Sequence, residues 1–87
     1  MHIEITTFKL AADASEADFL RADEAEQAHM HAHAYGLVRR TAARRADHTW
    51  LVLSFWYSAE NVVPRSENLM RFVDAATLVT EGYDTLD

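Results

Sequence analysis

The chain has no cysteine, one proline and two glycines among its 87 residues. The absence of cysteine excludes disulfides, thiolate metal sites and a thiol nucleophile. Two glycines are too few for a glycine-rich phosphate-binding loop. No segment approaches the ~20 apolar residues of a membrane span, and the polar side chains within the first ten residues are unlike a signal peptide. These absences predict a cytoplasmic protein that does not associate with a membrane.

Basic residues are also scarce. The chain has 8 Lys and Arg against 14 Asp and Glu, which leaves a net charge of −6. This balance disfavours nucleic acid or an anionic membrane as a partner. Apolar residues make up 49% of the chain, which is too many for a disordered segment. The length predicts one domain, residues 1–87, rather than two.

Four β-rich segments and two helical segments follow one another along the chain. Ser15 and Asp18 have the spacing of a helix N-cap, and Gly36 is placed to end that helix. Pro64 is expected either to kink the second helix or to be its first residue. Gly82 is expected to mark a bulge in the last strand. The predicted strands are residues 2–10, 37–44, 49–57 and 76–86, and the predicted helices are residues 15–34 and 64–73.

This order predicts a ferredoxin-like βαββαβ fold of the α+β class, with a four-stranded antiparallel sheet and both helices on one face. The third strand is apolar on both faces, because Trp50, Val52 and Trp56 point one way and Leu51, Leu53, Phe55 and Tyr57 point the other. A sheet with one wet face would alternate apolar and polar residues. We therefore expect a homodimer through the sheet face. The alternative is a monomer in which a loop or a folded-back tail covers the exposed aromatic side chains.

A resemblance to a known family is carried by segments 4–10 (EITTFKL), 36–40 (GLVRR) and 50–58 (WLVLSFWYS), together with Phe19, Leu20, Asp23 and Gln27. In these features the chain resembles the dimeric α/β-barrel superfamily, and within it the antibiotic-biosynthesis-monooxygenase-like branch of small proteins. It departs from the family pattern in its second helix, which is short and carries Pro64. The resemblance implies a dimer in which two sheets face each other as a barrel.

Two functions agree with this resemblance. One is a cofactor-independent monooxygenase or isomerase that acts on an aromatic or polyketide-like compound, with Asp23, Gln27 or His31 handling protons. The other is a non-catalytic dimeric module that binds a small ligand or has a structural role. A closed pocket of roughly 300 Å³ or more beside Asp23 would favour the enzyme or ligand-binding interpretation. A space filled by Met30, Phe72 and Trp56 would favour the structural one.

Asp23 and Gln27 lie on the face of the first helix that Phe19, Leu20, Met30 and Ala34 define as buried. An unpaired buried carboxylate is costly, so Asp23 needs a partner or a wet cleft. In one interpretation it is a base in a polar pocket. In the other it belongs to a satisfied network, with Arg39 or Arg40 or with a tyrosine hydroxyl.

An aromatic small molecule is the expected ligand, and Trp56 is the first candidate to contact it. Trp56 ends the third strand, just before the chain turns toward the second helix. On a small sheet, however, aromatic residues more often belong to the core or to an interface. The full set of predicted ligand contacts is Trp56, Arg39, Met30, Phe72 and Tyr83.

His29, His31 and His33 form a histidine cluster at the end of the first helix. His29 and His33 are four residues apart and share one side, as paired metal ligands can, whereas His31 points away. A third ligand would have to come from Glu26, His48 or elsewhere in the chain. Histidines also favour the negative end of a helix without any metal. We therefore predict no metal site.

Overall fold

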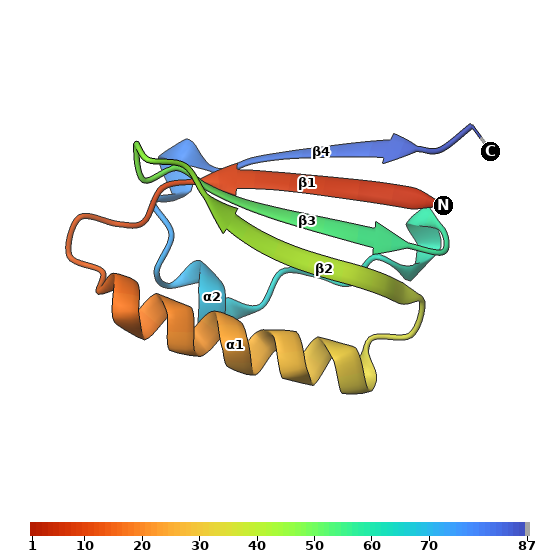
Figure 1. Cartoon of the computed structure of the whole chain (residues 1–87), viewed down its shortest axis with the longest axis horizontal. Helices are drawn as coiled ribbons and strands as arrows, with labels where there is room; N and C mark the ends of the chain where they lie inside the picture. The colour runs from red at the N-terminus through yellow and green to blue at the C-terminus, as the bar shows by residue number, and fades with distance from the viewer. Residues whose placement is uncertain (87) are drawn as a thin grey trace.

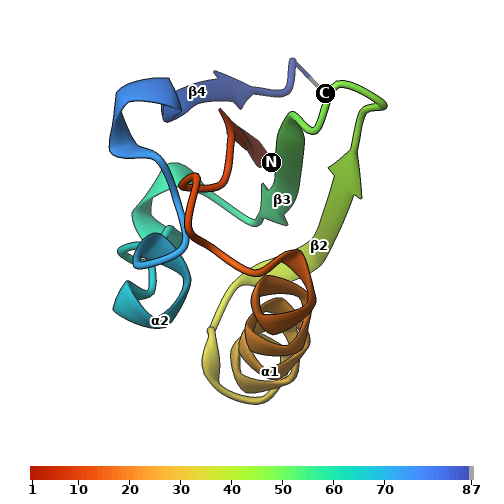
Figure 2. The same ribbon diagram turned by 90° about the vertical axis from the view of Figure 1, so that its left-hand side faces the viewer.

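The computed structural model describes residues 1–86 and confirms the predicted βαββαβ order. The strands β1 (His2–Phe8), β2 (Leu37–Arg44), β3 (Trp50–Trp56) and β4 (Val79–Asp84) form one antiparallel sheet in the order β2-β3-β1-β4. The helices α1 (Glu16–His33) and α2 (Glu67–Met70) lie on the same face of this sheet (Figures 1 and 2). The chain therefore has an α+β, ferredoxin-like fold.

Helix α1 begins where its capping residues predict. The Ser15 hydroxyl accepts a hydrogen bond from the Asp18 backbone N–H, and acidic residues in the first turn complement the helix dipole. Phe19 is the helix's fully buried side chain, at 1% exposure. The expectation that Leu20 shares the buried face is wrong, because its side chain is 49% exposed. One residue turns a helix by about 100°, which is enough to carry Leu20 around to the solvent side.

The hydrophobic core lies between the helices and one face of the sheet. Its buried members include Phe8, Phe19 and Trp50, and Leu69 and Val73 complete it from α2 and the segment that follows. The Phe19 ring meets the Phe8 and Trp50 rings edge-on, at centroid distances of 5.8 and 5.0 Å. Edge-to-face contacts of this kind stabilise by about 0.5–1.5 kcal/mol beyond the buried area. These three aromatic residues hold α1 against β1 and β3.

The opposite face of the sheet carries a second apolar layer with no element over it among residues 1–86 (Figure 2). Ile5 pairs with Leu53 and Ile3 pairs with Phe55 at its centre. Val79 and Tyr83 on β4 extend the layer and are each 51% exposed. The predicted alternation along β3 is therefore confirmed, with its two tryptophans toward the helices.

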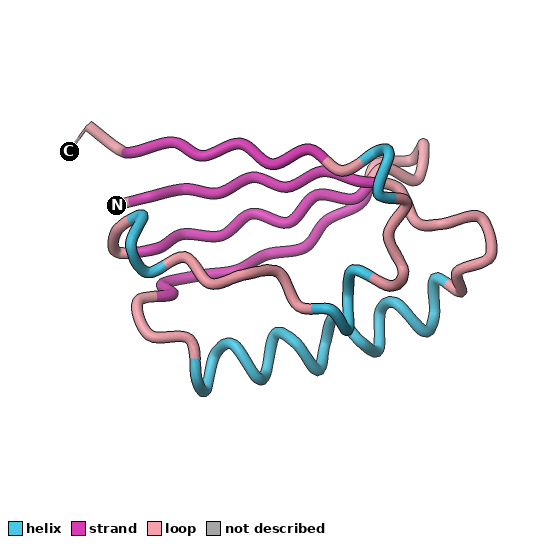
Figure 3. Tube along the Cα trace, turned by 180° about the vertical axis from the view of Figure 1, so that it is seen from behind, coloured by secondary structure: helices cyan, strands magenta, loops and turns pink. Residues whose placement is uncertain are grey.

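The region around Pro64 differs from both predictions. A short 3₁₀ turn, η1 (Ala59–Asn61), follows β3, and residues 62–66 then run extended beneath the sheet (Figure 3). Helix α2 begins at Glu67, where the Ser66 hydroxyl caps the backbone N–H of Asn68. Pro64 is therefore neither a kink nor the first helical residue. Its missing N–H has no consequence in an extended segment outside the helix.

Two strand ends and one bulge also need correction. β1 ends at Phe8, and Leu10 forms an isolated bridge with Val73 instead. β4 begins at Val79, because a 3₁₀ turn, η2 (Ala75–Thr77), precedes it. The bulge lies between Leu37 and Arg39 in β2, while the register through Gly82 is regular. Gly82 instead leaves room for the His2 ring, since an added Cβ would lie 3.0 Å from the His2 Cε1.

Candidate ligand-binding site

Trp56 combines deep burial with an unused hydrogen-bond donor. It ends β3 on the helix-facing side and is 2% exposed. Its Nε1 is a buried side-chain polar atom without a hydrogen-bond partner in the part of the chain that the structure describes. The residue also lies outside the cluster formed by Trp50, Phe8 and Phe19. Buried donors are almost always paired in folded proteins, so this one needs an explanation.

Trp56 lines a cavity of about 90 Å³ between the sheet and the helices, which we call the inner cavity. Its walls mix apolar side chains such as Met30 and Val52 with polar side chains such as Thr6, Ser54 and Arg40. Several waters would fit in this volume, but a whole aromatic ligand would not.

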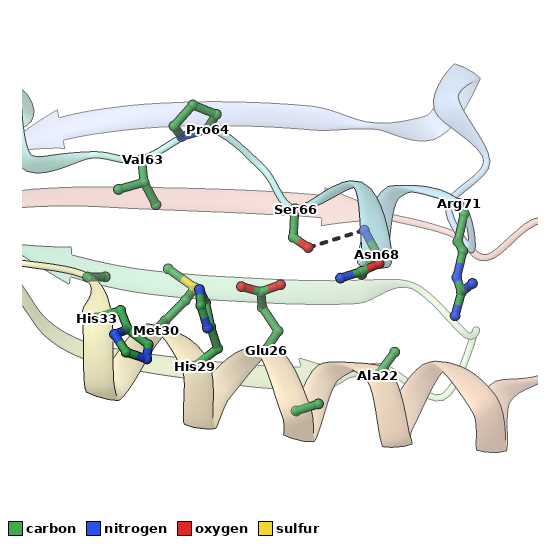
Figure 4. A pocket seen from close by; sticks show the side chains of 12 residues that line it. Ala22, Glu26, His29, Met30, His33, Val63, Pro64, Ser66, Asn68 and Arg71 are labelled. Atoms are coloured by element: carbon green, nitrogen blue, oxygen red, sulfur yellow. Dashed lines mark hydrogen bonds between the residues drawn. The ribbon is translucent and has the colours of Figure 1, made fainter.

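A second, larger space lies outside the inner cavity, between α1 and the extended segment that leads to α2. This outer groove has a volume of about 600 Å³ (Figure 4). The small side chains of Ala22 and Ala25 line the groove from α1, and Ala34 lines it just beyond the end of that helix. Asn68 and Arg71 line its α2 side (Figure 4). The two spaces share the lining residues Glu26, Met30, Val63, Pro64 and Ser66, so they adjoin one another.

Asp23 and Gln27 lie behind the inner cavity rather than in it. The Arg40 guanidinium donates to the Asp23 carboxylate at 2.6 Å and to the Gln27 side-chain oxygen at 2.9 Å. Gln27 returns a hydrogen bond to the backbone oxygen of Arg40. Of the alternatives for Asp23, the structure shows the satisfied network with a strand arginine. Neither Asp23 nor Gln27 lines the inner cavity or the outer groove, so neither space is the closed pocket beside Asp23 that would favour an enzyme. A proton-handling role for either residue stays a prediction.

The other predicted site residues are divided between the two faces of the sheet. Met30 and Trp56 line the inner cavity together. Phe72 packs edge-on against Phe19 at 5.9 Å, as part of the core margin. His31 is exposed on α1 and lines neither space.

Arg39 and Tyr83 lie on the open face of the sheet. Arg39 pairs with Phe55 of β3, and Tyr83 pairs with Ile3 of β1. Within one chain the sheet therefore separates them from Trp56, and a contact of Arg39 or Tyr83 with a ligand stays a prediction. The Tyr83 hydroxyl donates to the Glu81 carboxylate at 2.8 Å, and this bond together with the nearby negative charge raises the pKa of Tyr83.

His29 and His33 share one side of α1, as their spacing predicts. Their ring centroids are 4.8 Å apart, and both line the outer groove (Figure 4). Within residues 1–86, no group of three or more His, Asp or Glu side chains is arranged to hold a metal ion. None of the helices in the same residues has the length and apolar character to cross a bilayer.

Sequence reasoning missed Glu26 and the extended segment as parts of this site. Glu26 lies four residues before Met30, and this spacing alone puts the two on one helix face. The sequence therefore contained the information needed to place Glu26 beside Met30. The contribution of Val63 and Pro64 had no such signal, because it depends on an irregular segment whose path is set by tertiary packing.

No family model matches the chain, and no curated protein sequence matches it significantly. Several solved structures do share its fold. A proposed antibiotic biosynthesis monooxygenase from Caulobacter crescentus CB15 aligns over 99% of this chain and 90% of its own, at 15% identity and a TM-score of 0.81.

Two further structures extend the comparison. SnoaB, a cofactor-independent oxygenase from Streptomyces nogalater, aligns over 99% of this chain and 93% of its own, at 16% identity and a TM-score of 0.75. A proposed antibiotic biosynthesis monooxygenase from Nitrosomonas europaea aligns over the whole of both chains, at 14% identity and a TM-score of 0.76. The chain therefore has the ferredoxin-like fold of the antibiotic biosynthesis monooxygenase structures, as the resemblance in its sequence predicts.

Proposed function

We propose that this chain is a small homodimeric monooxygenase that binds an oxygen-bearing aromatic compound at Trp56 and oxidises it without a cofactor. The observation that carries the proposal is the buried, unpartnered Nε1 of Trp56 at the wall of the inner cavity. A ligand oxygen that accepts this hydrogen bond would remove a penalty of about 1–3 kcal/mol. The cavity wall thus offers a hydrogen bond at one defined point.

The two adjoining spaces support a ligand larger than the inner cavity. The outer groove lies within the ~300–1,000 Å³ that small-molecule sites occupy. Met30, Val63 and Pro64 belong to both spaces and supply apolar contacts where they meet. We infer that the ligand body lies in the groove while its oxygen reaches toward Trp56. A movement of the flexible Met30 side chain would widen the passage between them.

The reaction class rests on the comparison with SnoaB, whose fold this chain shares and which is a cofactor-independent oxygenase. An electron-rich aromatic ligand can itself supply the electrons. For 1-naphthol, reaction with dioxygen gives 1,4-naphthoquinone and water, so one oxygen atom enters the ligand and the other leaves as water. No separate reductant is required for that balance.

The apolar layer on the open face of the sheet supports the proposed homodimer. Ile3, Ile5, Leu53 and Phe55 lie on this face and remain partly accessible in the single chain. Burying side chains of this size contributes about 1.5–3 kcal/mol each before ordering costs. A second copy supplies a matching surface, because a twofold interface brings the same patch together from both chains.

A non-catalytic binding module is the second candidate. This candidate is favoured by the hydrogen-bond network with Arg40. Asp23 and Gln27, two of the residues predicted to handle protons, are already bonded to Arg40 in it. Ligand binding at Trp56 is common to both functions. Only turnover separates them.

The binding proposal is tested with a matched pair of tryptophan variants. Trp56→Phe removes the unpartnered donor, whereas Trp50→Phe alters a tryptophan on the same face of the same strand that does not line the inner cavity. Calorimetric titration of the native chain should show that 1-methoxynaphthalene binds about tenfold more tightly than naphthalene, because only the ether offers an acceptor. Trp56→Phe should abolish this preference, and Trp50→Phe should keep it.

Two results would contradict the proposal. One is the absence of binding of either probe to the native chain, and the other is a preference that survives in Trp56→Phe. Turnover is measured separately, by dioxygen uptake and naphthoquinone formation from 1-naphthol without added cofactor. Binding without turnover would reject the oxygenase and leave the binding module.

A further inference from the structure

Glu26 differs from the other partly buried acidic side chains of α1. Glu16 pairs with Arg44 at 2.5 Å, and Asp23 pairs with Arg40 at 2.6 Å. No ion pair or hydrogen bond engages the Glu26 carboxylate within residues 1–86, although this residue is also only partly accessible. The Glu26 oxygens are not among the buried polar atoms without a partner, so they remain accessible from the outer groove and are free to accept a hydrogen bond from a bound group.

The position of Glu26 connects it to the proposed ligand. It is one of the residues that line both the outer groove and the inner cavity. Figure 4 shows its carboxylate rising from α1 toward the sheet and the segment that carries Pro64 and Ser66. Trp56 lines the same inner cavity. The site therefore combines an unpartnered acceptor from α1 with an unpartnered donor from β3.

The arginines around these two spaces have other partners. Arg40 is held by Asp23 and Gln27. Arg65 donates to the Thr80 hydroxyl, and Arg71 lies over the Phe72 ring at 4.8 Å. Glu4, a second acidic side chain, also lines the inner cavity. Hydrogen bonds to a hydroxyl and contacts with an aromatic ring leave the charge of an arginine in place, so only Arg40 is neutralised, by Asp23. In the lining of the inner cavity the two carboxylates, Glu4 and Glu26, therefore outnumber the one arginine without a carboxylate partner, Arg65, and this balance is unfavourable for an anionic ligand.

We propose that Glu26 determines the class of ligand by accepting a hydrogen bond from a ligand hydroxyl, while Trp56 donates to an oxygen of the same ligand. This inference rests on the proposed function of the Trp56 site. Glu26 and Trp56 together select a neutral hydroxylated compound over the corresponding ether, which lacks the hydroxyl donor. They also select it over a carboxylate, which Glu26 and Glu4 both repel. Hydrogen bonds to a charged acceptor are about twice as strong as neutral ones, so the hydroxyl contributes strongly to selection.

The test compares three probes of similar size, namely 1-naphthol, 1-methoxynaphthalene and 1-naphthoate, on the native chain and on variants. The native chain should bind 1-naphthol on the order of tenfold more tightly than the ether, and the naphthoate most weakly. Glu26→Gln and Glu26→Ala should each reduce the preference for 1-naphthol over the ether several-fold and should improve naphthoate binding. Glu24→Gln, which neutralises an exposed carboxylate on the same helix, should leave all three affinities unchanged.

The outcomes separate this inference from the proposed function. If both Glu26 variants keep the native ratios between the affinities for the three probes, Glu26 has no role in selection. If Trp56→Phe weakens binding of the ether in the same experiment, the proposed Trp56 site still stands. If no probe binds the native chain, the proposed function fails and this inference fails with it. The ratio between probes is the readout because a general loss of stability would weaken all three together.

Discussion

Arg40 is a charged side chain held inside the protein by two residues of the facing helix. Its side chain is 4% exposed, and that of its partner Asp23 is 14% exposed. Removing one member of a buried pair leaves the other charge uncompensated, which typically costs about 3–5 kcal/mol. Asp23→Ala should therefore lower the free energy of unfolding by about 3 kcal/mol, as measured by urea denaturation.

Asp18→Ala is the matched control for this pair. Asp18 also pairs with an arginine, Arg21, but both side chains are more than half exposed. Exposed pairs contribute about 0–1 kcal/mol, so this variant should change the unfolding free energy little. Equal losses from the two variants would show that the Arg40 pair does not carry the stability assigned to it.

At the scale of elements, the connection from α1 to β2 depends on Gly36. Its φ angle is +86°, and a Cβ added there would lie 2.4 Å from the Cγ of Asn61. Asn61 cannot move freely, because its side-chain oxygen accepts from the Ser58 backbone and hydroxyl. Gly36→Ala should therefore destabilise the chain by more than about 1 kcal/mol, through both backbone strain and the steric contact.

Gly82→Ala provides the comparison within the same sheet. Gly82 has no positive φ angle, and the contact that an added Cβ would make is with the His2 ring at the start of β1. A small shift of that ring relieves the contact, so the loss of thermal stability should be smaller than for Gly36→Ala. A larger loss of thermal stability in Gly82→Ala than in Gly36→Ala would contradict this prediction. It would mean that the η1 turn moves to accommodate the methyl group added at residue 36.

At the scale of the whole molecule, the decisive feature is the apolar open face of the sheet. Leu53 lies near its centre, between Ile5 of β1 and Thr41 of β2. Leu53→Asp would place a charge in the proposed interface between two copies, and it should shift the protein from the proposed dimer, at twice 9.9 kDa, to a single chain at micromolar concentration. Analytical ultracentrifugation measures the change.

Leu20→Asp is the control for added charge, because Leu20 is a 49% exposed leucine on the outer side of α1. This variant should sediment like the native protein. A native chain that sediments as a single 9.9 kDa species would reject the dimer. It would also leave Ile3, Ile5 and Phe55 without a physical reason for their position.

Short-range patterns in the sequence were sufficient to determine the order of elements, the capped start of α1 at Ser15 and the two apolar faces of β3. These features follow from residue spacing and local hydrogen bonds, which a sequence displays directly. The tertiary structure alone decided that Arg40, rather than Arg39, meets Asp23. Neighbours in a strand point to opposite faces, and the bulge between Leu37 and Arg39 sets which residue faces the helix. The unpartnered donor of Trp56 and the free carboxylate of Glu26 likewise emerge only when distant segments pack together, because burial and the absence of a partner within residues 1–86 are properties of the assembled fold.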